Sequence, residues 1–358
     1  MELKNATTAG DLIDFLKLQS SALLGDGSTR IQSFELPNSD KPDSFAFIKK
    51  EKWIEVVETS RVACILAPTK LRFQIADKGS KKTWIFCDNV DLAAQKIKSH
   101  FVFATPYRPS SIKGIHPSAV VAPNARVAAS AAVGAFAVIG ENCVIEENCF
   151  IGSHCVLEEN VVIAEGSTLH PHVYVGHSCQ VGRFCEIKPQ AVIGSEGYGY
   201  AHDARGHHHR IPHTGRVILR DFVHVGALTA IDRGTLGDSI IGENTKIDNL
   251  CHFAHNSVIG KNGLLTASTI MAGSSTLGDN FICGGQTGIT GHIQVTDNVN
   301  VAARSGITNS IKKSGAYGGF PVIPLKDHLK SATSLAHLPT LRKQVNRILR
   351  HLFPEEFQ

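Results

Sequence analysis

The sequence predicts a mainly β protein built on a parallel β-helix, with an N-terminal α/β domain and C-terminal α-helices. Three observations predict this fold class. Every sixth residue from 115 to 193 is Ile, Leu or Val, and the same period returns between 219 and 307. The first hundred residues lack this period. The last forty have a polar and apolar pattern that is typical of helices.

A period of six fits neither an α-helix nor an alternating strand, but it fits a short strand followed by a bend. Three hexads then form one 18-residue coil of a triangular prism. The aliphatic residues point inward, and each coil advances by one strand spacing of about 4.8 Å. The register breaks between residues 194 and 216. A four-residue insertion after Ile231 shifts the register again before Ile241.

The chain divides into four predicted segments: an α/β domain at 1–104, a Pro- and Ser-rich linker at 105–114, the β-helix at 115–311 and a helical extension at 312–358. In the first domain we expect helices near 11–17, 53–59 and 90–101, and strands at 44–48, 62–66 and 84–87. The extension should hold two helices, 326–336 and 341–352, separated at Pro339.

Composition excludes several classes of protein. The chain has 358 residues, 42% hydrophobic and 19% charged, with a net charge of +4. This composition argues against disorder and against a nucleic-acid-binding protein. No apolar run reaches the roughly 20 residues of a membrane span, and the N-terminus has no signal-peptide pattern, so we expect a soluble, cytoplasmic protein.

The nine cysteines indicate packing rather than disulfides or a metal site. No C-x-x-C pair occurs. Cys143, Cys149 and Cys155 are spaced by six residues, as are Cys179 and Cys185. These residues therefore belong to the repeat, and we expect small buried thiols and no bound metal.

The segment 247–260, IDNLCHFAHNSVIG, carries the clearest chemical signal. His255 follows the inward Phe253 by two residues, and the position one coil further is Gly273. A glycine there leaves room for the imidazole and exposes a backbone N–H. A base beside such a donor suits acyl transfer, in which the N–H stabilises the oxyanion. His292 lies near the next stacked position, and Asp248 in the preceding hexad is placed to orient a histidine.

Other polar groups have less specific interpretations. The His207, His208 and His209 run lies in the segment that interrupts the repeat, where a metal site is disfavoured because no Cys or carboxylate framework accompanies it. We assign His252 a structural role. Eight Lys or Arg and a single acidic residue, Asp327, occur between 312 and 350. This pattern fits either a solvated helical face or a surface that binds an acidic partner.

The hexads resemble those of the hexapeptide-repeat acyltransferases, which implies a left-handed β-helix. Longer stretches resemble the UDP-3-O-(3-hydroxyacyl)glucosamine N-acyltransferases of lipid A biosynthesis, over nearly the whole chain. These stretches are GYGYA (197–201), GRVILRDFVHVGALTAIDRG (215–234), IDN and HFAHNSVIG within 247–260, IMAGS (270–274) and GGQTGITGH (284–292).

The resemblance implies transfer of a 3-hydroxyacyl chain from acyl carrier protein to the 2-amino group of a UDP-3-O-acylglucosamine. The donor is the 4'-phosphopantetheine thioester of the carrier, with no other cofactor and no metal. His255 matches the general base, Gly273 the oxyanion donor and His292 a second active-site histidine. Asp248 and Asn249 match an acid and amide pair. The family forms homotrimers with sites between neighbouring rods, and the basic C-terminal segment would meet the acidic carrier.

The resemblance also implies two substrate-binding regions. Members of the family stack uracil between aromatic rings of the N-terminal domain, and here Phe47 and Trp53 flank Lys50. Lys50 and Trp53 depart from the Asn and Tyr associated with this spacing, although a Trp ring offers the same π-face. Gly306 and Thr308 lie where large side chains limit acyl length in some members. Their small size predicts room for a longer chain.

Three alternatives remain open. One is a UDP-N-acetylglucosamine O-acyltransferase, which normally lacks the N-terminal domain. Another is a different hexapeptide-repeat sugar acyltransferase or CoA-dependent acetyltransferase, whose chains are usually shorter. The last is a non-enzymatic scaffold, against which the pairing of His255 with Gly273 argues.

Overall fold

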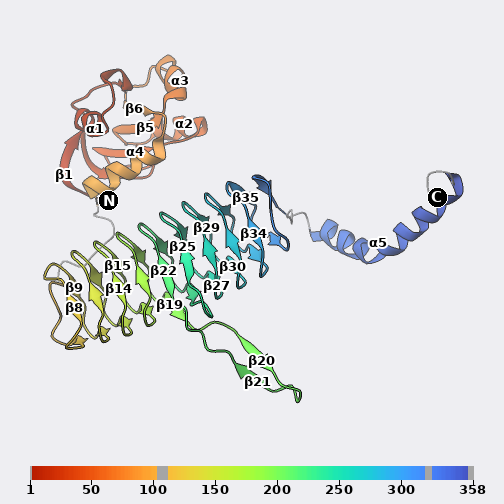
Figure 1. Ribbon diagram of the computed structural model, residues 1–358. Coiled ribbons are helices and arrows are strands. Elements are labelled where there is room, and N and C mark those ends of the chain that lie inside the picture. Colours follow the sequence, from red (N-terminus) through yellow and green to blue (C-terminus); the bar gives the residue numbers. More distant parts are fainter. Residues whose placement is uncertain (1, 103–111, 319–324, 354–358) are drawn as a thin grey trace. The chain divides into compact units, whose positions relative to one another are not determined.

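The computed structural model describes residues 2–102, 112–318 and 325–353, and the chain forms two compact units, Met1–Ser110 and Ser111–Gln358 (Figure 1). Most of the predicted linker, at 105–111, lies outside the described residues. The predicted fold class, a left-handed parallel β-helix with an α/β unit before it and helical structure after it, is confirmed. Among the described residues no helix combines the length and apolarity needed to cross a membrane.

A six-stranded mixed sheet forms the centre of the first unit, in the order β1-β3-β4-β5-β6-β2. Strands β3 to β6 are parallel, and the two outer strands run antiparallel to their neighbours. The strands are β1 (Glu2–Thr8), β2 (Leu23–Leu24), β3 (Arg30–Phe34), β4 (Ser44–Phe47), β5 (Cys64–Pro68) and β6 (Thr83–Cys87). The α-helices are α1 (Ala9–Phe15), α2 (Ile54–Thr59), α3 (Arg72–Asp77) and α4 (Val90–Ile97).

The sequence predicted the centre of this sheet but not its margins. Strands β4, β5 and β6 and helices α1, α2 and α4 were expected, within about two residues except at the end of α4. There the α-helix stops at Ile97, and Lys98–Val102 continue as a π-helix. Strands β1, β2 and β3 and helix α3 were missed. The polar sequence of β1 and the two-residue length of β2 give no periodic signal.

Three parallel sheets form the faces of the rod in the second unit (Figure 1). Face 1 contains β7 (Val120–Val121), β10 (Val138–Ile139), β13 (Val156–Leu157), β16 (Tyr174–Val175), β19 (Val192–Ser195), β24 (Ala230–Asp232), β27 (His252–Phe253), β30 (Ile270–Met271), β33 (Gly288–Ile289) and β36 (Gly306–Ile307). Face 2 contains β8 (Arg126–Val127), β11 (Val144–Ile145), β14 (Val162–Ile163), β17 (Gln180–Val181), β22 (Val217–Leu219), β25 (Ser239–Ile241), β28 (Val258–Ile259), β31 (Thr276–Leu277) and β34 (Gln294–Val295). Face 3 contains β9 (Ala132–Val133), β12 (Phe150–Ile151), β15 (Thr168–Leu169), β18 (Glu186–Ile187), β23 (His224–Val225), β26 (Lys246–Ile247), β29 (Leu264–Leu265), β32 (Ile282–Cys283), β35 (Val299–Val301) and β37 (Gly315–Tyr317).

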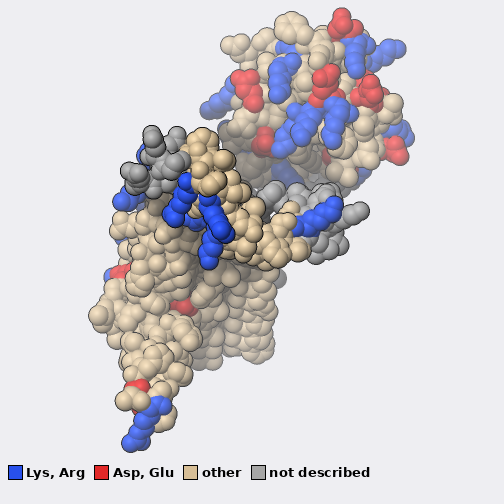
Figure 2. All heavy atoms as spheres, turned by 90° about the vertical axis from the view of Figure 1, so that its right-hand side faces the viewer, with Lys and Arg blue, Asp and Glu red and all other residues tan. Residues whose placement is uncertain are grey.

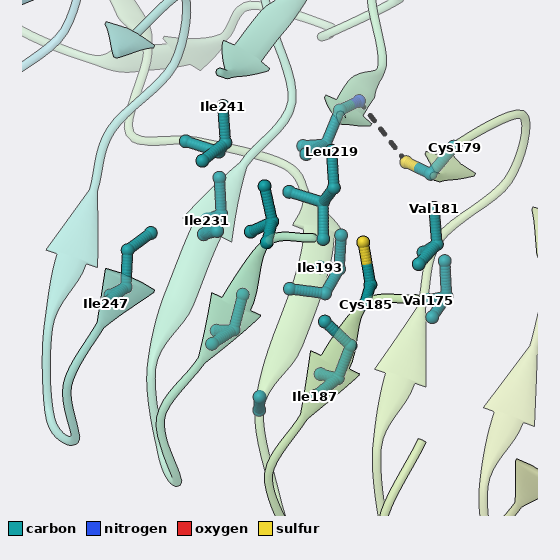
Figure 3. Close-up of a cluster of buried hydrophobic side chains, with 14 of the residues drawn as sticks. Val175, Cys179, Val181, Cys185, Ile187, Ile193, Leu219, Ile231, Ile241 and Ile247 are labelled. Atoms are coloured by element: carbon teal, nitrogen blue, oxygen red, sulfur yellow. Dashed lines mark hydrogen bonds between the residues drawn. The ribbon is translucent and has the colours of Figure 1, made fainter. Parts of the chain in front are cut away.

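The pairing register confirms the 18-residue coil. Ile139 pairs with Leu157, one coil further along the chain. The offset becomes 38 residues between Ile193 and Ile231, where the chain inserts a hairpin, and 22 residues between Ile231 and Phe253. The inward side chains stack in rows along the interior (Figure 3). Insertions therefore leave the core intact because they are accommodated at a corner, outside the stacked positions.

The predicted cysteine packing is confirmed: all nine thiols are free and buried. Burial raises the pKa of Cys155 to about 11 and that of Cys185 to about 12, so both remain protonated at neutral pH. Cys179 accepts a hydrogen bond from the N–H of Val217 at 3.3 Å (Figure 3). The thiols thus serve as small apolar groups with a weak polar contact.

The C-terminal segment differs from the prediction. Strand β37 extends face 3 beyond residue 311, and a single helix, α5 (Leu325–Leu352), replaces the two expected helices. Pro339 lies inside this helix. Its ring removes one backbone N–H, but the helix continues on both sides of it. The described side chains of α5 are mostly exposed, including Leu338, Leu341 and Val345.

Candidate active site

His255 lies against Gly273 at the corner where face 1 turns into face 2. Strand β27 ends at Phe253 and places His255 two residues later; Gly273 follows Met271 in the same way one coil further. A Cβ added at Gly273 would lie 2.7 Å from both Cε1 and Nε2 of His255. The imidazole therefore occupies the space that a side chain at position 273 would fill. The stacking expected from the sequence is present.

The hydrogen bonds of Asn256 define the tautomer of His255. The N–H of Thr235 donates to the side-chain oxygen of Asn256 at 3.0 Å, which identifies that atom as an acceptor. Nδ1 of His255 lies 3.1 Å from the same oxygen and must therefore carry a proton to make this bond. Nε2, against Gly273, is left with its lone pair, as a general base requires.

Side-chain oxygens cap some of the corner N–H groups at equivalent positions of the rod. Seven such groups donate to a carboxylate or amide oxygen at 2.7–3.0 Å: those of Glu165, His177, Arg183, Ala227, Lys261, Ala267 and Asp279. No acceptor for the Gly273 N–H occurs among the described residues. This N–H is available to a ligand, in keeping with the oxyanion role expected for it.

The segment that interrupts the repeat forms a β-hairpin of β20 (Tyr200–His202) and β21 (His208–Arg210), which projects from the rod (Figure 1). Its base packs on the histidine. A Cβ added at Gly197 would lie 3.1 Å from Cβ of His255, 3.2 Å from Nε2 of His213 and 3.3 Å from Oδ2 of Asp232. Any larger residue at position 197 would require these three side chains to shift by a few tenths of an ångström.

Sequence reasoning missed Asp232, His213 and Asn256. Asp232 is 6% exposed and directly follows Ile231, on the same corner as His255 but one coil earlier. Oδ1 of Asp232 accepts a hydrogen bond from Ser195 at 3.0 Å, and Oδ2 lies 3.8 Å from Nε2 of His252. The 22-residue offset at this point aligns Asp232 with Ala254, so applying it to the AIDRG run would have placed Asp232 beside the residue that precedes His255.

Of the other predicted catalytic residues, His292 lies near the site and Asp248 does not contact it. The N–H of His292 donates to the carbonyl of Gly273 at 3.1 Å, which places His292 one coil beyond the glycine. The carboxylate of Asp248 accepts from the N–H of Asn249 at 2.8 Å and from that of Ala267 at 3.0 Å. No hydrogen bond or ion pair joins Asp248 to a histidine among the described residues. The expectation that Asp248 orients a histidine is not supported, because its oxygens cap backbone groups at another corner.

Asn249 has a similar capping role, since its side-chain oxygen accepts from the N–H of Ala227 at 2.7 Å. His252, which we assigned a structural role, is partly exposed and lies beside Asp232. The hairpin carries His207, His208 and His209. Nδ1 of His207 and Nε2 of His209 each lie 3.1 Å from Asp203. Within the part of the chain that the structure describes, no group of three or more side chains is arranged to hold a metal ion.

The predicted substrate-binding residues lie in two separate places. Phe47 ends β4 and, with Phe34 and Lys98, lines a pocket of about 380 Å³. Lys50 and Trp53 follow in the next turn but do not line that pocket, and Trp53 is 39% exposed. Gly306 and Thr308 line a different cavity of about 440 Å³ at the end of the rod.

The fold and the corner define the class: a hexapeptide-repeat acyltransferase, with a histidine base beside a bare backbone N–H. The family model "GMPPB C-terminal domain" matches residues 115–198, the first part of the rod. The chain is 40% identical to the UDP-3-O-acylglucosamine N-acyltransferase of Paraburkholderia phytofirmans over 252 residues, 68% of this chain and 67% of that protein. It is 41% identical to the enzyme of that name from Chromohalobacter salexigens over 251 residues, 70% of this chain and 69% of the other.

The chain belongs to the UDP-3-O-acylglucosamine N-acyltransferase family. Among solved structures, a UDP-N-acetylglucosamine acyltransferase from Francisella novicida aligns with 61% of this chain and 73% of its own, at 23% identity and a TM-score of 0.46.

Proposed function

We propose that this enzyme transfers a 3-hydroxyacyl group from the 4'-phosphopantetheine thioester of acyl carrier protein to the 2-amino group of UDP-3-O-(3-hydroxyacyl)glucosamine. The position of His255 against Gly273 carries the proposal. Nδ1–H is held by Asn256, so Nε2 is the free base, and the adjacent N–H has no acceptor among the described residues.

The chemistry follows from these two groups. The amine nitrogen attacks the thioester carbonyl and forms the N–C bond while Nε2 of His255 takes a proton from that nitrogen. The N–H of Gly273 stabilises the negative charge on the carbonyl oxygen. The C–S bond then breaks, and the imidazolium returns its proton to the departing sulfur. His292, beyond Gly273, assists the placement of the substrates. No step requires a metal or a further cofactor.

The remaining roles follow from the family. We assign the uridine to Phe47, Lys50 and Trp53 and the acyl chain to the cavity beside Gly306 and Thr308. The active enzyme is a homotrimer of cytoplasmic location, where its nine free thiols stay reduced.

The described part of α5 supports a role in binding the carrier protein. It presents Lys330, Arg342, Lys343, Arg347 and Arg350 and no described acidic side chain. By contrast, Lys and Arg mix with Asp and Glu over the first unit (Figure 2). A helix surface that carries only positive charges attracts an acidic partner and increases its rate of association.

The test is an acyl-transfer assay with 3-hydroxyacyl carrier proteins of several chain lengths, with products identified by mass. UDP-3-O-acylglucosamine is the acceptor, and UDP-N-acetylglucosamine is the control sugar. We expect N-acylation of the first sugar, and a loss of at least about 100-fold in kcat for His255→Ala. The matched control is His154→Ala, because this exposed histidine only stacks on Phe136 and His172 at another corner. Transfer to the hydroxyl of the control sugar would instead identify an O-acyltransferase.

A further inference from the structure

The mechanism above leaves one buried charged group beside the base unexplained. Asp232 is 6% exposed, and its one hydrogen bond among the described residues comes from the hydroxyl of Ser195. Its sequence neighbour Arg233 does not neutralise it, because that guanidinium donates to the carbonyls of Gly194 and His177. The nearest group that can carry a positive charge is His252, whose Nε2 lies 3.8 Å from Oδ2 of Asp232. A buried carboxylate is costly unless positive charge lies nearby.

Three histidines face this carboxylate from three parts of the fold. His252 comes from β27, His213 from the segment after the hairpin, and His255 from the corner. Gly197 lies among them: its added Cβ would be within 3.3 Å of Oδ2 of Asp232, Nε2 of His213 and Cβ of His255. Oδ2 of Asp232 therefore lies within about 6.4 Å of Cβ of His255, and the attraction of His255 is among the charges that lower the pKa of Asp232.

One ring nitrogen of His213 is committed to its own segment. Its Nδ1 lies 2.9 Å from the carbonyl of Ile211 and therefore carries the ring proton that it donates to that oxygen. Its Nε2 is buried without a hydrogen-bond partner among the described residues. Of the three rings, His255 is the one that gains a proton during the proposed reaction. A further positive charge is thus produced near Asp232 during catalysis.

We infer that Asp232 is a positioning residue for acyl transfer, whose buried carboxylate stabilises the imidazolium that forms when His255 accepts the proton of the substrate amine. This inference rests on the proposed function. Asp232 acts through space on His255 and does not touch the substrate, whereas Asn256 holds the tautomer directly. The charge is present before the reaction, so no reorganisation is needed at the transition state.

The protonation of Asp232 provides a pH signature. Burial raises the pKa of Asp232 above its usual value, although the surrounding histidines oppose this shift. As the pH falls, the carboxylate consequently becomes protonated at a higher pH than an ordinary aspartate. The stabilisation of the imidazolium should be lost over that same acidic range.

The decisive variant is Asp232→Asn, which keeps an oxygen that can accept from Ser195 and removes the charge. We expect kcat at pH 8 to fall by about 10- to 100-fold while KM for both substrates stays within about twofold. The ratio of wild-type to variant kcat should decrease towards one as the pH is lowered. The matched control is Asp221→Asn, because Asp221 is likewise a corner carboxylate but accepts from the N–H and the guanidinium of Arg183 at another corner. We expect the control to retain kcat.

Several outcomes would overturn the inference while leaving the proposed function intact: wild-type kcat in Asp232→Asn, a ratio independent of pH, or a rise in KM alone. If Asp232→Asn does not fold, Asp232→Glu and Ser195→Ala serve in its place. Both variants keep a carboxylate charge near His255, so each should keep kcat within about tenfold of wild type. A larger loss of kcat in both variants would overturn the inference. A wild-type enzyme that folds but transfers no acyl group to the amine would refute the proposed function itself.

Discussion

Two corners of the same rod show how one backbone geometry serves either stability or chemistry. At the corner that follows β26, the carboxylate of Asp248 caps the N–H groups of Asn249 and Ala267. At the corner that follows β30, Gly273 occupies the equivalent position to Ala267, and its N–H has no acceptor among the described residues. A histidine ring lies beside it instead of a carboxylate.

The comparison shows that the active corner differs from a capped corner in two ways: it lacks a side-chain acceptor and a side chain at Gly273, and it gains the imidazole of His255. Every coil exposes N–H groups at its bends, and at some of these bends a carboxylate or amide oxygen accepts from them. A corner N–H without an acceptor lowers the stability of the fold, but the same N–H is then available to bind the oxyanion. The glycine also creates the space for His255, so a single position provides both the donor and the room for the base.

The largest effect is expected from Gly273→Ala. Its Cβ would meet the imidazole at 2.7 Å and displace Nε2 by a distance that misaligns proton transfer. We expect kcat to fall by at least about 100-fold while the circular dichroism spectrum is unchanged. Gly288→Ala is the control for the stability of the coil, because nothing lies within 4 Å of its added Cβ. Wild-type kcat in Gly273→Ala would mean that the bare corner is not the active one.

Asn256→Ala tests whether the tautomer of His255 depends on its neighbour. Without the amide oxygen, Nδ1 loses the nearer of its two partners and keeps only the Thr235 hydroxyl at 3.4 Å, and we expect kcat to fall by about tenfold. Asn262→Ala is a closely matched control, since Asn256 and Asn262 share the same corner position and a φ of 57°. Both variants should lower Tm through backbone strain, but only Asn256→Ala should lower kcat. Equal kcat values would remove Asn256 from the mechanism.

The rod could be predicted from the sequence because its period repeats in every coil. Inward positions such as Ile139 and Leu157 obey a single rule, and Gly273 was found from the same rule as the position one coil beyond His255. The first unit has no such repetition. Its margins depend on tertiary pairing that no local sequence pattern indicates. The two-residue β2, for example, forms by pairing with β6.

The misses at the site have a common physical cause. Asp232 and His213 reach His255 across insertions that change the coil offset from 18 to 22 or 38 residues, so simple stacking did not bring them together. Asp248 was expected near a histidine because it is close in sequence, but the chain turns a corner between them, and its carboxylate faces other backbone groups. Pro339 was expected to end a helix and instead lies within one.

The smallest effect concerns a capped corner and should appear in stability rather than activity. Burial alone would raise the pKa of Asp221, but hydrogen bonds from the Arg183 side chain and N–H outweigh it and hold that pKa below its usual value. Asp221 therefore contributes stability above the pKa of an unfolded aspartate, and this contribution is lost as the pH falls through the folded value. We expect Asp221→Asn to lower Tm at pH 7 by about 1–2 °C, because the pair is partly exposed. The difference from wild type should shrink steadily below about pH 4 in thermal unfolding followed by circular dichroism. A difference in Tm that persists unchanged at about pH 2.5 would show that the charge of the Asp221 carboxylate does not stabilise this corner. The difference between this corner and the Gly273 corner would then come only from the shapes of their side chains.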